Sequence, residues 1–439
     1  MSDTSTRTGF DEQALARLPQ APAPFVDRLR AQALEEFLAL PVPSPETEEW
    51  RYTDLSGFDF GFTPWAEGGH AANLDGVPPE ILEAAGTVGD RAGLQIQRNS
   101  EVMVTHLDPE LAAQGVLLMD LDEAARQHED LVEPNLHALV PTNRTRFTAL
   151  HGAFRSGGTF LYVPRGVTAR LPIQTLTYLD ADGGAVFPHT LIVAEEDSEV
   201  TFIDRLVSPD LTKALSDAVV EVHAGPASRV RYVCLQEWGS GVQHLSVQRT
   251  QLARDAEFRS LGVAFGGELA RSEIESVLAE PGGFSEMLGL YFADGDQHFD
   301  HRALQDHVAP NCSSNLLYKG ALKERSNAVY SGWVNVRPGA QKTDAFQTVR
   351  NIVLSEEAKA ASIPNLEIQA NDVRCGHAAS DGPVEEDTLF YLESRGIPRA
   401  EAERLIVFGF FQEVLDKVTL PEVRDGLAHA IEAELARVR

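Results

Sequence analysis

The chain has 439 residues, of which 43% are hydrophobic and 23% are charged. This composition is typical of a folded protein with an extensive core, and it excludes disorder along the whole chain. Lys and Arg number 37 against 66 Asp and Glu, so the net charge is −29. A surface this acidic repels phosphate backbones, which argues against nucleic acid as a partner.

The sequence carries no membrane or export signal that we can identify. The densest apolar run, from Leu405 to Phe411, is seven residues long, whereas a membrane-spanning helix needs roughly 20. The first residues form neither the basic nor the apolar region of a signal peptide. The three cysteines, Cys234, Cys312 and Cys375, are too few for a disulfide framework. We therefore expect a cytoplasmic protein without membrane contact.

In chain order, residues 1–95 are expected to form an N-terminal helical region, because apolar residues keep a loose helical spacing between prolines. Residues 96–380 consist of short β-type runs. In one of them, Val230, Tyr232 and Cys234 occupy every second position, as residues on one face of a strand do.

A turn of small and charged residues recurs between these β-type runs at intervals of 28 to 32 residues. Its central positions are Ser198, Ser228, Ala256 and Ser285, with a later pair at Ser326 and Ala358. A near-constant period of this length indicates a stacked solenoid, and the absence of helical patterns between the turns indicates a β-helix. A β-sandwich is the alternative, because its strands also recur at short intervals. We predict a mainly β fold with a β-helix core.

Residues 381–439 are expected to form a C-terminal helical subdomain. The helix that begins at Pro398 is apolar on nearly all sides and therefore needs cover on all sides. A partner protein or the β body would supply that cover, and we leave both alternatives open. The candidate partner-binding residues on this helix are Leu405, Val407, Phe408 and Phe411.

The sequence lacks the motifs of a P-loop ATPase, a zinc protease and a serine hydrolase. We therefore expect a non-enzyme that binds no nucleotide. One dense group of metal-ligating residue types runs through His298, Asp300, His301, Asp306 and His307. On a strand, however, His298 and His301 point to opposite faces, and polar ladders on a solenoid wall explain the group equally well.

The second group is Cys375-Gly376-His377. Residues i and i+2 of a strand share a face, so this thiol and imidazole can meet one soft metal ion or a cluster iron. Arg374 is a neighbour that would favour the thiolate. Two ligands do not close a site, so the others would come from elsewhere, for example a second chain. A buried cysteine beside a histidine without any ligand role is the alternative.

Several segments together make the chain resemble a known family, the SufB/SufD family of iron–sulfur cluster assembly proteins. The matching segments are 48–55 (EEWRYTDL), 163–167 (VPRGV), 317–320 (LYKG), 339–345 (GAQKTDA), 366–368 (LEI) with 375–377 (CGH), and 389–397 (LFYLESRGI). The chain is most similar to the SufD branch. Residues 351–370 contain no cysteine, whereas the SufB pattern has its essential cysteine in that region.

The resemblance implies a right-handed parallel β-helix flanked by helical regions at both ends. It also implies a complex in which SufB pairs with this chain through the β-helix and the ATPase SufC binds the C-terminal helices. His377, with Cys375, would then hold a transient iron–sulfur cluster at the interface with SufB. The family pattern continues with Gly-Ala-Thr-x-Gly, whereas residues 378–382 read AASDG.

Two other functions remain open at this point. A β-helix polysaccharide lyase or esterase would need exposed carboxylates and an arginine in a groove, for which Asp300, Asp306 and Arg302 are the candidates. A purely structural partner of SufB would leave all metal chemistry to SufB.

Overall fold

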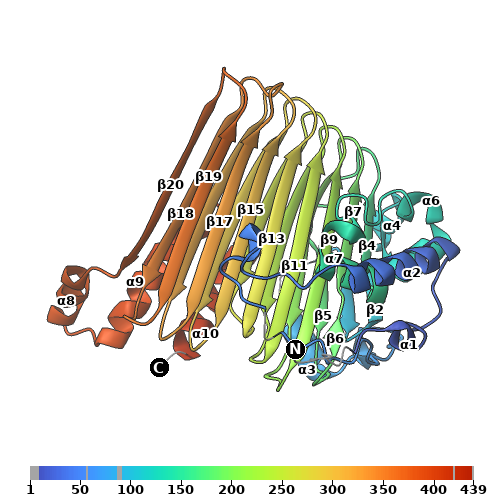
Figure 1. The fold of residues 1–439 in the computed structure, drawn as a ribbon, viewed down its shortest axis with the longest axis horizontal. Helices are drawn as coiled ribbons and strands as arrows, with labels where there is room; N and C mark the ends of the chain where they lie inside the picture. Colours follow the sequence, from blue (N-terminus) through green and yellow to red (C-terminus); the bar gives the residue numbers. More distant parts are fainter. Residues whose placement is uncertain (1–8, 56–57, 87–90, 419–420, 438–439) are drawn as a thin grey trace.

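The computed structural model describes residues 9–55, 58–86, 91–418 and 421–437. Its body is a parallel β-solenoid built from two sheets of ten strands each, and from β7 on successive strands of the chain alternate between the sheets. Figure 1 shows the strands stacked side by side, with helices gathered at the two ends. The prediction of a mainly β chain with a parallel β-helix between helical ends is confirmed.

The first sheet contains, in spatial order, β2 (Glu101–Leu107), β1 (Gly93–Arg98), β5 (Ile173–Tyr178), β8 (Glu199–Val207), β10 (Arg229–Glu237), β12 (Glu257–Ala264), β14 (Phe284–Ala293), β16 (Ser313–Leu322), β18 (Asp344–Val353) and β20 (Arg374–Pro383). From β8 to β20, neighbouring strands begin 27 to 31 residues apart in the sequence. Each coil of the solenoid therefore uses about the number of residues that the recurring turn predicts.

The second sheet contains β19 (Lys359–Ile368), β17 (Asn327–Val336), β15 (His298–His307), β13 (Leu269–Leu278), β11 (Val242–Leu252), β9 (Ala214–Ala224), β7 (His189–Ala194), β4 (Thr159–Val163) and β3 (Leu117–Asp120), with the short β6 (Ala185–Val186) beside β9. All pairs in both sheets are parallel except β1 with β2 and β3 with β4, which are antiparallel.

The turns that enter the first sheet share one backbone conformation. Asp197, Ala227 and Asp255 have φ angles of 57°, 55° and 58°, which is the left-handed region that a turn of this kind requires. Ser198 and Ser228, the small residues that follow, are fully buried. The stacked turns therefore explain why a small residue recurs at a fixed interval.

Helices before the solenoid are more extensive than the sequence indicated. They are α1 (Glu12–Leu15), α2 (Pro24–Ala39), η1 (Glu48–Trp50), η2 (Leu74–Gly76), α3 (Pro79–Ala85), α4 (Pro109–Ala113), α5 (Leu121–Gln127), α6 (Glu129–Val132), η3 (Thr142–Arg144) and α7 (Arg146–Phe154). The last six of these, from α3 on, interrupt or adjoin the first strands, and the uninterrupted solenoid starts at β4. The sequence analysis did not predict the helices between 109 and 154, because most of them are only one or two turns long and give no clear helical period.

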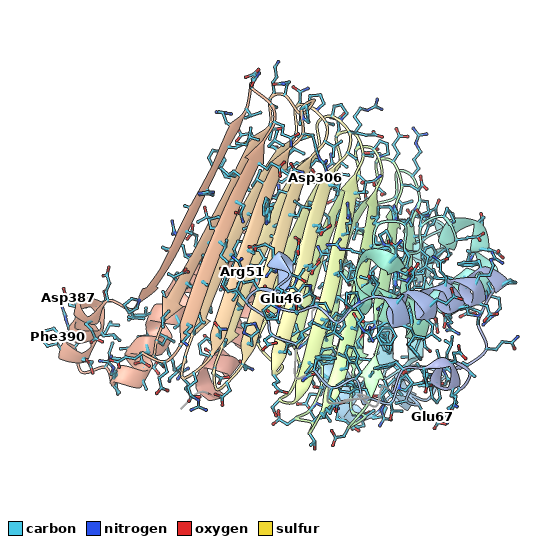
Figure 2. All side chains as sticks on the ribbon, in the orientation of Figure 1. Glu46, Arg51, Glu67, Asp306, Asp387 and Phe390 are labelled. Atoms are coloured by element: carbon cyan, nitrogen blue, oxygen red, sulfur yellow. The ribbon has the colours of Figure 1, made fainter. Side chains whose placement is uncertain are left out.

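Three helices follow the solenoid: α8 (Glu386–Ser394), α9 (Arg399–Leu415) and α10 (Pro421–Arg437). Helix α9 packs on the outer face of the first sheet over β14 and β16, against a row of outward-facing apolar residues that includes Leu288 and Leu317. Lys319 of β16 fixes this position by donating a hydrogen bond of 2.8 Å to the carbonyl oxygen of Phe410. In contrast, α8 extends away from the body, and Phe390 lies at its outer end (Figures 1 and 2).

Candidate functional site

Cys375 and His377 lie on β20, the last strand of the first sheet. Their register partners on β18 are Ala345 and Gln347, which face the interior of the solenoid and are 0% and 1% exposed. Both side chains therefore belong to the inner face, and the expectation that they share one face is met. Because β20 is the edge of its sheet, His377 is exposed and Cys375 is half-buried.

The end of the solenoid that carries this pair is uncovered in the described part of the chain. β20 and β19 are the terminal strands of their sheets, and each presents a row of backbone groups that no described strand pairs. Behind them, Asp381 of β20 accepts hydrogen bonds from Asn351 at 2.8 Å and from the Ser362 hydroxyl at 2.7 Å. The open end thus combines two free strand edges with an ordered set of polar groups.

The surroundings of Cys375 favour the neutral thiol. Burial is the main cause that raises the pKa of Cys375, and the nearby Asp344 carboxylate raises it further, against a lowering by a backbone hydrogen bond from Ala345. Arg374, which we expected to favour the thiolate, instead pairs with Asp344 at 2.6 Å. The sulfur atom adjoins an apolar group that includes Val334.

The histidine-rich string on β15 is divided between two faces, as strand geometry predicts. His298 and Asp300 face outward and both bind the hydroxyl of Thr53, at 2.9 and 2.7 Å. His301 faces the interior, where its ring lies 4.6 Å from that of Tyr291. His307 is buried and binds the Ser314 hydroxyl at 2.7 Å. The string therefore does not form one metal site.

The carboxylates considered for a lyase or esterase are buried and paired. Asp300 is 0% exposed and forms ion pairs with Arg271 and Arg302. Asp306 is 4% exposed and pairs with Arg337 at 3.0 Å. Neither carboxylate is available to a polysaccharide substrate in a groove.

The four apolar residues singled out on α9 divide into two groups. Val407 and Phe411 are 1% and 0% exposed and pack on the first sheet. Phe408 is partly buried beside them, whereas Leu405 is 47% exposed. The β body thus supplies part of the cover that this helix needs, and Leu405 remains open to solvent.

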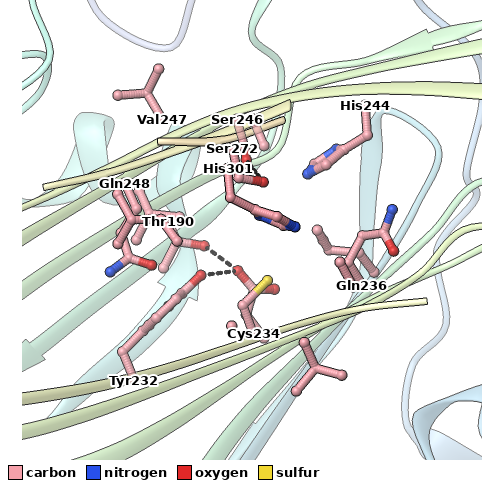
Figure 3. A pocket seen from close by; sticks show the side chains of 18 of the residues that line it. Thr190, Tyr232, Cys234, Gln236, His244, Ser246, Val247, Gln248, Ser272 and His301 are labelled. Atoms are coloured by element: carbon pink, nitrogen blue, oxygen red, sulfur yellow. Dashed lines mark hydrogen bonds between the residues drawn. The ribbon is translucent and has the colours of Figure 1, made fainter. Parts of the chain in front are cut away.

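A pocket inside the solenoid, between the two sheets, brings together residues that the sequence analysis did not connect (Figure 3). Buried Asp204 accepts hydrogen bonds from the hydroxyls of Thr190 and Tyr232, at 3.3 and 3.0 Å. Burial is the main cause that raises the pKa of Cys234, with the nearby Asp204 adding to it. His301 points into the same space. The alternation of residues along β10 predicted that Tyr232 and Cys234 share a face, but it did not predict that Asp204 and His301 lie in the same pocket.

The described helices include none that is long and apolar enough to cross a membrane.

Comparison with known protein families matches nearly the whole solenoid. Residues 177–410 match the family model described as SUF system FeS cluster assembly, SufBD core domain. Residues 92–175 match the model described as SufBD protein N-terminal region. Two models of one family therefore follow each other in order along the chain.

Individual relatives agree with this result. The iron–sulfur cluster assembly protein SufD of Bacillus subtilis is 31% identical over 98% of this chain and 99% of its own length. A SufBD family protein of Mycobacterium tuberculosis is 34% identical over 90% of each chain. SufB of Bacillus subtilis is 28% identical over 91% of this chain and 87% of its own length. The chain therefore belongs to the SufBD family of iron–sulfur cluster assembly proteins.

Proposed function

We propose that this chain is a SufD-like, non-catalytic subunit of a cytoplasmic SufBCD-type scaffold, and that SufB docks on the open end of its solenoid. The observation that carries the proposal is the position of Cys375 and His377 on the inner face of the terminal coil. The free edges of β19 and β20 support it, because an unpaired strand edge pairs readily with another chain.

In this proposal, iron and sulfide are the cargo and the chain contributes only ligands. The His377 imidazole supplies a nitrogen donor, which suits iron. The raised pKa of Cys375 keeps its sulfur mostly protonated near neutral pH, and a thiol is a weaker ligand than a thiolate. The two residues therefore have unequal roles, with SufB completing the cluster ligands. ATP is bound by SufC and not by this chain.

A reconstitution experiment tests these roles. We expect a SufB–SufC complex containing the His377→Ala variant to assemble less than half the wild-type amount of iron and sulfide, and Cys375→Ala to reduce it less. The measurement is the iron and sulfide content of the purified complex after reconstitution. His106→Ala, which removes an exposed histidine from β2 at the other edge of the first sheet, is the matched control.

Neither variant is expected to unfold the protein, since solenoid stability is distributed over many coil interfaces. Full cluster assembly by His377→Ala in an intact complex would contradict the ligand role. The chain would then be a purely structural partner of SufB, which is the second candidate function.

We further propose that SufC binds the exposed face of the C-terminal helices, at Leu405 of α9 with Phe408 at its margin. The exposure of Leu405 supports this, as does the 71% exposure of Phe390 on α8. A helical subdomain that presents large apolar side chains to solvent is a candidate interaction surface.

Leu405→Asp is expected to weaken the binding of SufC roughly tenfold or more, because burying a leucine contributes about 1.5–3 kcal/mol. The dissociation constant measured by calorimetry checks this. Leu38→Asp is the matched control, because Leu38 is 52% exposed and lies on α2, among the N-terminal helices. Equal affinities for both variants would place the SufC surface elsewhere.

A further inference from the structure

A cluster of three histidines lies at the opposite end of the molecule from Cys375 and His377. His151 comes from α7, His189 begins β7, and His137 lies in the loop between α6 and η3. They are 0%, 1% and 7% exposed, and one nitrogen atom from each lies within 4.8 Å of the others. The cluster lies between the outer face of the second sheet and the N-terminal helices, and it is separate from the open end.

Hydrogen bonds fix which nitrogen of each ring carries the proton. The Nδ1–H group of His137 donates to the carbonyl oxygen of Val140 at 2.9 Å, and that of His151 donates to the carbonyl oxygen of Asp217 at 2.8 Å. Both acceptors are carbonyls, so each nitrogen must be the donor. The Nε2 atoms of these two rings are therefore left with lone pairs.

His189 is oriented by a carboxylate. Its Nε2–H group donates to Glu221 at 3.1 Å, which leaves a lone pair on Nδ1. Glu221 is itself held by the backbone N–H groups of His137, Leu139 and Val140, at 2.7 to 2.9 Å. A carboxylate or a carbonyl on the far nitrogen of each imidazole is the usual outer shell of a metal-bound histidine.

The three lone pairs converge without a donor between them. His151 Nε2 and His189 Nδ1 are 3.1 Å apart, and His137 Nε2 is buried with no hydrogen-bond partner. Lone pairs that face each other at this distance repel unless a cation lies between them.

We propose that His137, His151 and His189 form a binding site for one borderline divalent transition metal ion, of the class of Zn²⁺ or Fe²⁺, with Glu221 as the orienting carboxylate. Imidazole nitrogens suit this class, whereas Mg²⁺ and Ca²⁺ prefer oxygen ligands. Nitrogens about 2.0–2.1 Å from a tetrahedral ion lie roughly 3.3 Å apart, so His151 and His189 already have nearly the required spacing. His137 would approach by at most roughly 1.5 Å, because its nitrogen lies within 4.8 Å of the other two.

The backbone at His137 is consistent with such a site. Its φ angle is 56°, a left-handed conformation that is uncommon for residues other than glycine. This conformation lets the same residue bind Glu221 through its backbone and point its ring at the other two. The ion would join the N-terminal loop, α7 and β7, so it would stabilise the start of the solenoid.

The site is tested on the full chain, stripped of metal and then titrated with Zn²⁺, Fe²⁺ or Co²⁺ alone. We expect one ion per chain, visible absorption bands of nitrogen-coordinated Co²⁺, and a thermal midpoint that rises with free Zn²⁺ concentration. His137→Gln and His151→Asn should each lose the bands and the shift in midpoint. His244→Gln is the matched control, because His244 is equally buried and binds Ser216 at 3.0 Å, outside the cluster.

The Cys375→Ala/His377→Ala double variant separates this site from the proposed cluster site, because it should keep the ion and the shift. Absence of Co²⁺ bands in the wild-type chain would overturn the proposal. So would retention of the bands in both His137→Gln and His151→Asn, or their loss in the double variant. If His151→Asn does not fold, His137→Gln decides the outcome, because His137 lies in a loop and its ring makes a single hydrogen bond, to a backbone carbonyl.

Discussion

Replacing Arg271 with methionine is expected to reduce the free energy of unfolding by up to about 3–5 kcal/mol, the usual cost of breaking a buried ion pair, because Asp300 then keeps only Arg302 as a cationic partner. Arg271 is 2% exposed and pairs with Asp300, which is 0% exposed, and with Glu273 at 2.7 Å. Its guanidinium group also lies 3.8 Å from the centre of the Trp50 ring. The substitution therefore removes a link between the solenoid wall and the segment that crosses it near Arg51 (Figure 2).

Asp300 gives this prediction a pH dependence. Burial alone would raise the pKa of its carboxyl group, but Arg271, Arg302 and Thr53 together lower it. Because the pKa of Asp300 is lower in the folded chain, its ionised carboxylate stabilises the fold at pH values above the ordinary aspartate pKa of about 3.9. This stabilisation is lost as the pH falls through the lowered pKa of the folded chain. The Arg271→Met variant should consequently unfold at a higher pH than wild type during acid titration.

Urea denaturation followed by circular dichroism measures both effects. The double variant Arg271→Met/Asp300→Asn is the control, because it also removes the buried Asp300 charge and should recover part of the lost stability. Equal stability of the single and double variants would show that Asp300 is not an uncompensated charge in the single variant. Arg271→Met should shift the pH of acid unfolding less in an Asp300→Asn background than in the wild-type background.

Much of the fold could be predicted because the solenoid repeats a local rule. The turns before the strands of the first sheet from β8 to β18 place a left-handed residue before a small buried one, as at Asp197 with Ser198, and this leaves a trace in the sequence. Ser285, predicted as a member of this series, is instead the second residue of β14, and Gly283 holds the turn position. The pair Ser326 and Ala358 belongs to the opposite corner, where the chain enters the second sheet. The repeat length alone does not distinguish the turns that enter the first sheet from those that enter the second, because each kind of turn occurs once per coil.

The candidate sites show where this reasoning stops. Strand alternation placed Cys375 and His377 on one face and separated His298 from His301, since both results depend only on neighbours in the sequence. The cluster at His137, His151 and His189 left no such trace, because its members come from a loop, a helix and a strand. Only the packing of the N-terminal helices on the second sheet brings them together. A spacing pattern does not encode contacts of that kind.

Phe411→Asp is expected to detach α9 from the solenoid and to lower the stability of the C-terminal subdomain by at least about 3–5 kcal/mol. That range is typical of deleting a buried phenylalanine side chain, and burying a carboxylate in its place adds to the cost. Phe411 is 0% exposed and packs with Val407 and Val414 on the outer row of the first sheet. The remaining coils should stay folded, because each coil is stabilised mainly by its neighbours.

Leu405→Asp is the matched control for this prediction, because it introduces the same charge on the same helix at an exposed position. Exposed substitutions usually change stability by no more than about 0.5 kcal/mol. Hydrogen exchange of the α9 amides measures the local effect, and we expect faster exchange in Phe411→Asp alone. If exchange were unchanged in Phe411→Asp, α9 would not depend on the solenoid for its stability. The helix would then be free to bind SufC through Val407 and Phe411 as well as Leu405, the arrangement that the sequence first suggested.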